Sequence, residues 1–186
     1  MNSPTDRTLK PCKSEIKNPI VNWELSWSLA NLDGLCSKHK TFLWKMLHNI
    51  LPTQDRLHRL KMRNAPNPVC TNCSSNEHDS LSHALVSCPI NKQVSDWLVQ
   101  VLQPHVPNTL PIQLVLLDLG LIEDEFKLPV VLIITEVFEY IWSCRKEKKK
   151  PQLFHTRAIL EAEIALLRET RFTDACSKIL MVMNSK

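Results

Sequence analysis

Residues 70–88 read CTNCSSNEHDSLSHALVSC and contain the strongest signal in this chain. Cys70 and Cys73 are separated by two residues, a spacing at which two thiolates bind one metal ion from a tight knuckle. His83 and Cys88 are separated by four residues and can complete a tetrahedron from a helix and the residue that follows it. Sulfur and nitrogen ligands without a carboxylate favour zinc over calcium or magnesium. The spacing therefore predicts a structural zinc site in which protein fills every position.

Other interpretations of this stretch remain open. A C-x-x-C pair also arises by chance, with both thiols merely buried, although the stretch is too polar to need buried cysteines. A redox pair is disfavoured because the motif does not follow a strand in a βαβ pattern. His78 competes with His83 as the imidazole ligand, since four residues separate it from Cys73. We expect His83, because it lies on the short helix that leads to Cys88.

Composition excludes several classes of protein. The chain has 186 residues with two glycines and 12 prolines, and no glycine-rich phosphate-binding motif occurs. Left-handed helix caps and tight hairpins mostly need glycine, so strands joined by tight turns are disfavoured. The longest apolar run, 128–142, is interrupted by Glu136 and Glu139 and is too short to span a bilayer. An odd count of seven cysteines without a secretory signal disfavours disulfides. We expect an intracellular protein, in the nucleus or cytoplasm, without a membrane partner.

Hydrophobic periodicity predicts helices on both sides of the cysteine cluster. Apolar residues recur every three or four positions over 37–50, which is typical of an amphipathic helix. Pro52 ends that helix, and Thr53 is placed to cap a second helix whose Leu57 and Leu60 are expected to face inward. Further periodic segments are 89–103, 112–119, 128–149 and 156–171. The predicted fold is all-α, with a helical hairpin, a zinc knuckle and a small C-terminal helical bundle.

Polar and proline-rich segments divide the chain. Residues 1–20 have almost nothing to bury and predict a flexible tail, followed by a helical zinc-binding module over 21–103. Three prolines within eight residues mark a linker region over 104–127. Residues 128–186 form the expected C-terminal helical segment.

The net charge of +4 is unevenly distributed. Over 36–63, seven basic residues face one acidic residue, and over 144–150 five basic residues face Glu147 alone. This pattern fits a polyanion-binding surface, and it also fits ordinary solvated helix faces. Trp44 or His48 is a candidate for stacking on an unpaired base, or a residue of the core. The candidate nucleic-acid contacts are Lys38, Lys40, Lys45, Arg56, Arg59 and Arg63.

Several motifs occur in a characteristic order: Phe42-Leu43-Trp44-Lys45, then Pro52-Thr53 and Asp55-Arg56-Leu57, then Cys70-x-x-Cys73, His83 and Cys88-Pro89. This order resembles the zinc-binding region that follows the polymerase domain in reverse transcriptases of non-LTR retrotransposons. The resemblance covers 23–102 and, more loosely, Ile141–Arg145. It implies that the metal ligands are Cys70, Cys73, His83 and Cys88. Asp79 stands where the family usually has Glu.

The resemblance also implies a function. No Tyr-x-Asp-Asp polymerase motif and no Pro-Asp…Asp nuclease signature occurs, so the chain looks like a detached C-terminal portion of such a polyprotein. The implied role is that of a non-enzymatic accessory module, which binds the phosphate backbone of RNA or DNA and has a polymerase domain as partner. The alternative is a zinc-stapled protein-interaction scaffold without nucleic-acid binding. An enzyme is disfavoured, because Cys36 with His39 and Cys144 with Arg145 lack a triad or an open metal position.

Overall fold

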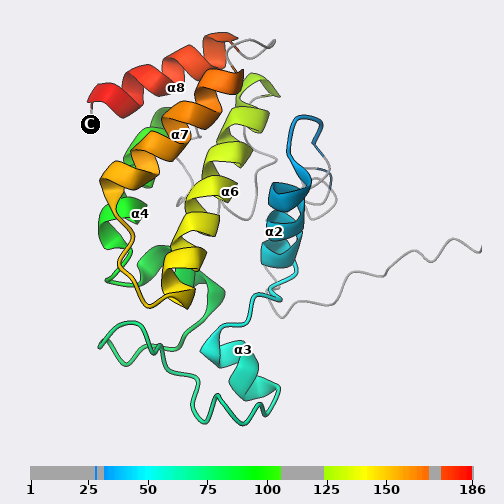
Figure 1. Cartoon of the computed structure of the whole chain (residues 1–186), viewed down its shortest axis with the longest axis vertical. Coiled ribbons are helices and arrows are strands. Elements are labelled where there is room, and N and C mark those ends of the chain that lie inside the picture. The colour runs from blue at the N-terminus through cyan, green and yellow to red at the C-terminus, as the bar shows by residue number, and fades with distance from the viewer. Residues whose placement is uncertain (1–27, 29–31, 106–123, 168–172, 186) are drawn as a thin grey trace, which may run out of the picture.

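The computed structural model describes residues 28, 32–105, 124–167 and 173–185. Their secondary structure is helical, and the one β-type pairing among them is an isolated bridge between Val69 and His78. The predicted all-α fold is therefore confirmed (Figure 1). The tail expected over 1–20 and the helix expected over 112–119 lie outside the described residues. The helices are α2 (Ser37–Leu47), α3 (Gln54–Arg59), η1 (His83–Ser87), α4 (Lys92–Leu102), η2 (Gln103–His105), α6 (Asp124–Lys146), α7 (Leu153–Leu167) and α8 (Thr173–Ser185).

Helix α6 is the centre of the fold. It lies between α2 and α7 (Figure 1) and also contacts η1, α4 and α8. A helix that is apolar on most of its circumference must be covered on most sides, and the other helices do this. One hydrophobic core therefore includes elements on both sides of residues 106–123. The fully buried members on α6 are Val130, Val131, Ile133, Ile134, Val137, Phe138 and Ile141.

Three helices end in left-handed residues other than glycine. Asn49, Lys61 and Lys148 have φ values of 50°, 55° and 53°. After α6, Lys149 N–H donates to Cys144 O at 2.8 Å, which is the 6→1 bond of a Schellman motif. An asparagine and two lysines therefore take the left-handed positions that glycine usually occupies at helix ends. Helix α6 accordingly ends before Lys149, the predicted end.

Charged side chains fix α2 onto α6. His39 Nε2 lies 2.5 Å from Glu136 Oε2, and Lys38 Nζ lies 3.2 Å from Glu139 Oε2. The hydrogen bond with Glu136 raises the pKa of His39 above its ordinary value and lowers the pKa of Glu136. These contacts join residues 97 and 101 positions apart, so α2 packs on α6 through charged side chains as well as through the core.

Helix α3 is short and peripheral. It lies beyond the C-terminal ends of α2 and α6 (Figure 1) and has no buried residue. Leu57 is half-buried and Leu60 is 58% exposed, so the expectation that Leu60 faces inward is wrong. The prediction that Thr53 caps this helix is confirmed, because its side chain accepts the Arg56 N–H. No helix in the described part of the chain is long and apolar enough to cross a lipid bilayer.

Candidate metal centre

A short hairpin-like loop presents the first two cysteines. Cys70 N–H donates to Glu77 O at 2.9 Å, and Asp79 N–H donates to Pro68 O at 2.8 Å. These two bonds flank the Val69–His78 bridge and hold the intervening residues in a closed loop. The polar sequence of this loop has few side chains that could form a core of their own. Backbone pairing and the cysteine sulfurs therefore determine its shape.

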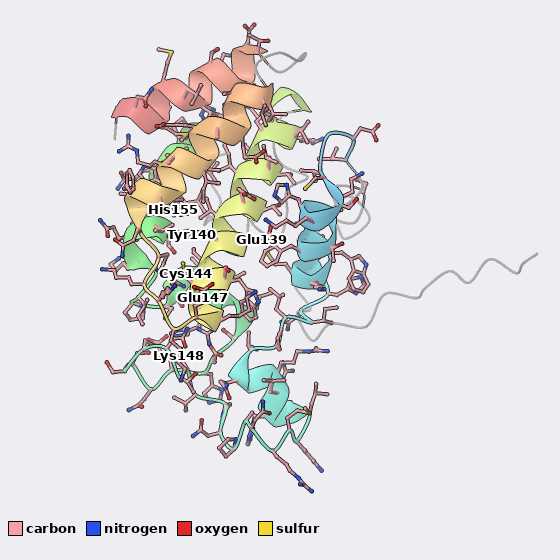
Figure 2. The ribbon with its side chains drawn as sticks, in the orientation of Figure 1. Glu139, Tyr140, Cys144, Glu147, Lys148 and His155 are labelled. Carbon is pink, nitrogen blue, oxygen red and sulfur yellow. The ribbon has the colours of Figure 1, made fainter. Side chains whose placement is uncertain are left out.

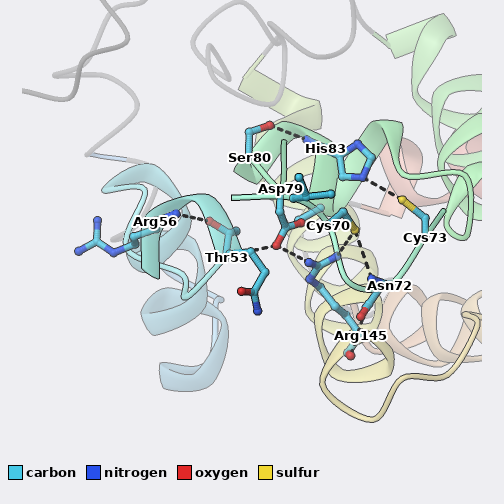
Figure 3. Close-up of polar contacts among 12 residues, drawn as sticks. Thr53, Arg56, Cys70, Asn72, Cys73, Asp79, Ser80, His83 and Arg145 are labelled. Atoms are coloured by element: carbon cyan, nitrogen blue, oxygen red, sulfur yellow. Dashed lines mark hydrogen bonds and ion pairs between the residues drawn. The ribbon is translucent and has the colours of Figure 1, made fainter. Parts of the chain in front are cut away.

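The structure brings the four predicted ligands together. The Sγ atoms of the three cysteines and a ring nitrogen of His83 all lie within 4.8 Å of one another. Cys73 Sγ and His83 Nε2 are 3.4 Å apart (Figure 3). A tetrahedral zinc ion with bonds of about 2.0 to 2.3 Å places its ligands about 3.5 to 4 Å apart, so this spacing fits one ion. Cys70, His83 and Cys88 are buried, and Cys73 is half-buried.

Helix η1 supplies the other two ligands through an unusual winding. Cys88 N–H donates to His83 O at 2.9 Å, which is the i→i+5 bond of a π turn. In an α-helix, residues five apart point to different faces, whereas the wider π turn brings them onto one face. Ser80 Oγ accepts the His83 N–H at 3.1 Å and holds the start of this turn. The backbone is therefore wound so that the side chains of His83 and Cys88 meet in the same cluster.

A carboxylate orients the imidazole. His83 Nδ1 lies 2.8 Å from Glu77 Oε2, which leaves Nε2 directed at the cysteine cluster. A metal-binding histidine usually donates its other ring N–H to such a carboxylate, which fixes the tautomer and the ring plane. Sequence reasoning missed Glu77, although a carboxylate six residues before the ligand histidine is a signal that could have identified it.

Two hydrogen-bond donors lie beside the sulfur of Cys70. It accepts the Asn72 N–H at 3.4 Å and lies 3.6 Å from Arg145 Nη1 (Figure 3). Three thiolates and one imidazole around a divalent ion leave one net negative charge, which the guanidinium offsets. Burial raises the pKa of the Cys88 thiol to about 12, so a metal ion must displace that proton to bind.

A buried ion pair links the knuckle to the helices. Asp79 is fully buried, and its Oδ2 accepts hydrogen bonds from Arg145 Nη2 and, at 2.7 Å, from Gln54 N–H. Asn72 Nδ2 also donates to Arg145 O at 3.2 Å. One carboxylate therefore joins the start of α3, the knuckle and the end of α6. Asp79 is the residue that forms this junction.

The competing histidine lies outside the cluster. The His78 side chain is 72% exposed, and its Nδ1 lies 4.0 Å from Asp55 Oδ1. A second group of potential ligands, His39, Glu136 and Glu139, also lies within 4.8 Å. In this group the Glu139 carboxylate is paired with the Lys38 ammonium, and the Glu136 carboxylate is paired with the His39 ring.

The predicted nucleic-acid contacts fall into two groups. Three of them take part in intramolecular contacts: Lys38 with Glu139, Arg56 with Asn49 O at 2.9 Å, and Arg59 with Asp55 at 3.1 Å. Lys45 and Arg63 are exposed and Lys40 is half-buried. Among the described residues, no ion pair engages these last three side chains. Trp44 is 42% exposed and packs at 4.3 Å between ring centroids on His48.

Comparison with known proteins agrees with this geometry. Residues 12–95 match the family described as zinc-binding in reverse transcriptase, and all four clustered ligands lie inside the matched segment. Comparisons with curated proteins and with solved structures gave no match. Residues 12–95 of this chain are therefore similar to the zinc-binding region of reverse transcriptases.

Proposed function

We propose that Cys70, Cys73, His83 and Cys88 hold one structural Zn²⁺ and that the surrounding module binds nucleic acid without catalysing a reaction. Three sulfurs and one imidazole are a preferred donor set for zinc. Because protein fills all four positions, no site is left open for a water or a substrate. The ion would stabilise a loop that buries little apolar surface, by about 10 kcal/mol or more.

Two basic segments of the chain lie close together in the structure, and this supports nucleic-acid binding. Residues 36–63 have seven basic residues against one acidic, and residues 144–150 have five against one. Contacts of Asp79 with Gln54 and Arg145 place parts of both segments beside the metal centre. A cluster of lysines and arginines attracts phosphates and releases their counterions. The proposed contacts remain Lys38, Lys40, Lys45, Arg56, Arg59 and Arg63, and the proposed protein partner is the polymerase domain of a retrotransposon reverse transcriptase.

Zinc content tests the first half of this proposal. Protein purified without chelator should contain one zinc per chain by elemental analysis, and Cys73→Ser should remove it. Cys36→Ser is the matched control, because Cys36 is an exposed thiol at the start of α2, away from the cluster. Absence of stoichiometric zinc in the parent protein would contradict the metal assignment.

Salt dependence of binding tests the second half. Affinity for single-stranded RNA or DNA, measured by fluorescence anisotropy, should fall steeply as salt rises, with a slope of about 0.7 log units per phosphate contact. Replacing Lys40, Lys45 and Arg63 by glutamine should flatten this slope by about 2 units while helix content and zinc content stay unchanged. Weak, salt-independent binding by the parent protein would overturn the proposal.

Exposed apolar side chains favour a second candidate function. Phe154 and Leu166 on α7 are 81% and 71% exposed, and Met181 on α8 is 72% exposed. A contiguous exposed apolar patch marks a surface that contacts another protein, and these side chains on adjoining helices are the candidates for such a patch. A module that fails to bind nucleic acid, yet associates through these residues, would act as a zinc-stapled scaffold.

A further inference from the structure

A groove runs between α2 and α6. Its volume is about 800 Å³, and its walls come from Ser37–Lys45 on one side and Glu136–Lys146 on the other. Buried Phe42, Leu51 and Trp142 contribute apolar surface to it. Figure 2 shows Glu139 on the side of α6 that faces α2. The groove is a recess on the surface and is separate from the metal centre.

One end of this groove is positively charged. The two helices run in the same direction, so their C-terminal turns meet at the end near α3 (Figure 1). Lys45 and Lys146 both line the groove from these turns, and both are exposed. At the other end the charges offset each other, since Lys38 pairs with Glu139 and His39 pairs with Glu136. Lys146 is absent from the contacts predicted from the sequence, because it lies 101 positions after Lys45.

Hydroxyl groups line the rest of the groove. Ser37, Thr41, Tyr140 and Ser143 all contribute to its walls. Thr41 Oγ donates to Ser37 O at 2.8 Å, so its oxygen still has acceptor capacity. Tyr140 Oη accepts the Gln152 N–H at 3.2 Å and also has a side-chain hydrogen bond with Cys144, so it adds polar surface to the wall. These groups can bond both phosphate oxygens and ribose 2′-hydroxyls.

We infer that the groove between α2 and α6 binds the backbone of single-stranded RNA, with Lys45 and Lys146 on its phosphates and the hydroxyl residues on its 2′-hydroxyls. This inference rests on the proposed nucleic-acid function. It adds that the bound strand lies between α2 and α6. A duplex is read by an element that protrudes into its groove, about 12 Å wide. Here the basic residues line a recess, which suits a single flexible strand.

The decisive experiment compares two double variants of the full chain by fluorescence anisotropy with a labelled single-stranded RNA. Lys45→Gln/Lys146→Gln should flatten the salt slope by about 1.4 units, which is a loss of about 25-fold in affinity at 0.1 M salt. Lys92→Gln/Lys178→Gln removes the same charge from α4 and α8, outside the groove, and should bind like the parent. Circular dichroism and zinc content check that both variants fold.

The outcomes separate this inference from the function on which it rests. If the parent protein shows no salt-dependent RNA binding, both are overturned. If the parent binds and the Lys45/Lys146 variant binds equally well, only the groove assignment is overturned. DNA of the same sequence should bind more weakly than RNA, and Thr41→Val/Ser143→Ala should remove that difference. Tighter binding of single-stranded DNA, or of a duplex, would overturn the assignment to single-stranded RNA.

Discussion

Arg145 is the residue whose loss should affect the most parts of this molecule at once. Its guanidinium bonds the fully buried carboxylate of Asp79 and lies 3.6 Å from Cys70 Sγ. Its side chain is 10% exposed, so water cannot readily take its place. Arg145→Gln removes the positive charge and leaves a shorter, neutral amide. It would leave the Asp79 carboxylate buried with the Gln54 N–H as its remaining partner among the described residues.

The expected magnitude follows from the burial. Removing one partner of a buried ion pair costs about 3 to 5 kcal/mol, because the remaining charge is uncompensated. That is a large part of the total stability of an ordinary domain, about 5 to 15 kcal/mol. Loss of the guanidinium beside Cys70 should also weaken metal affinity by about 10- to 100-fold, as observed for other residues that support metal ligands. Adding Asp79→Asn should recover much of the lost stability, because no charge is then left unpaired.

Urea unfolding followed by far-ultraviolet circular dichroism measures the first effect, and competition with a zinc chelator measures the second. Lys146→Gln is the matched control, because it removes the same charge from the next position and Lys146 is exposed. The reasoning is refuted if Arg145→Gln lowers the free energy of unfolding by less than about 1 kcal/mol. It is also refuted if the double variant is as unstable as the two single losses added together.

Three further predictions concern the His39–Glu136 ion pair and two residues with positive φ, Lys61 and Gly34. The ordinary pKa values of Glu136 and His39 are 4.5 and 6.5, and the pair shifts the first down and the second up. The ion pair therefore makes its full contribution to the free energy of unfolding between pH 4.5 and 6.5. The contribution is lost as pH rises through the raised pKa of His39, and it is lost as pH falls through the lowered pKa of Glu136. The difference in unfolding free energy between the parent and Glu136→Gln should shrink by about 1 to 3 kcal/mol towards pH 8, and a pH-independent difference would contradict this. Lys61→Gly should raise stability by about 1 kcal/mol in urea unfolding, because Lys61 has a φ of 55°, whereas Lys40→Gly inside α2 should lower it by a similar amount. Gly34→Ala should lower the thermal midpoint, because φ is 102° and the added Cβ would lie 2.8 Å from Leu128 Cδ2; an unchanged midpoint would show that this loop adjusts freely.

The sequence by itself determined the fold class and which three cysteines and one histidine cluster together. Three- and four-residue periodicity of apolar side chains is a local property, so the helices α2, α4, α6 and α7 were predictable near their observed bounds. The clustering of Cys70, Cys73, His83 and Cys88 was predictable for the same reason, since all four residues lie within 19 positions and their spacing restricts the geometry. Exact helix ends were less accessible, because Lys61 and Lys148 adopt left-handed caps that glycine usually provides.

Only the tertiary structure decided which distant charges meet. Arg145 bonds Asp79 across 66 positions, and His39 bonds Glu136 across 97. No local pattern encodes such pairs, because they depend on the direction in which α6 runs beside α2 and the knuckle. The same packing turned Lys38 towards Glu139 and placed Lys45 and Lys146 in one groove. Charge counted along a sequence does not say which cations are paired, since pairing is set by helix packing and burial.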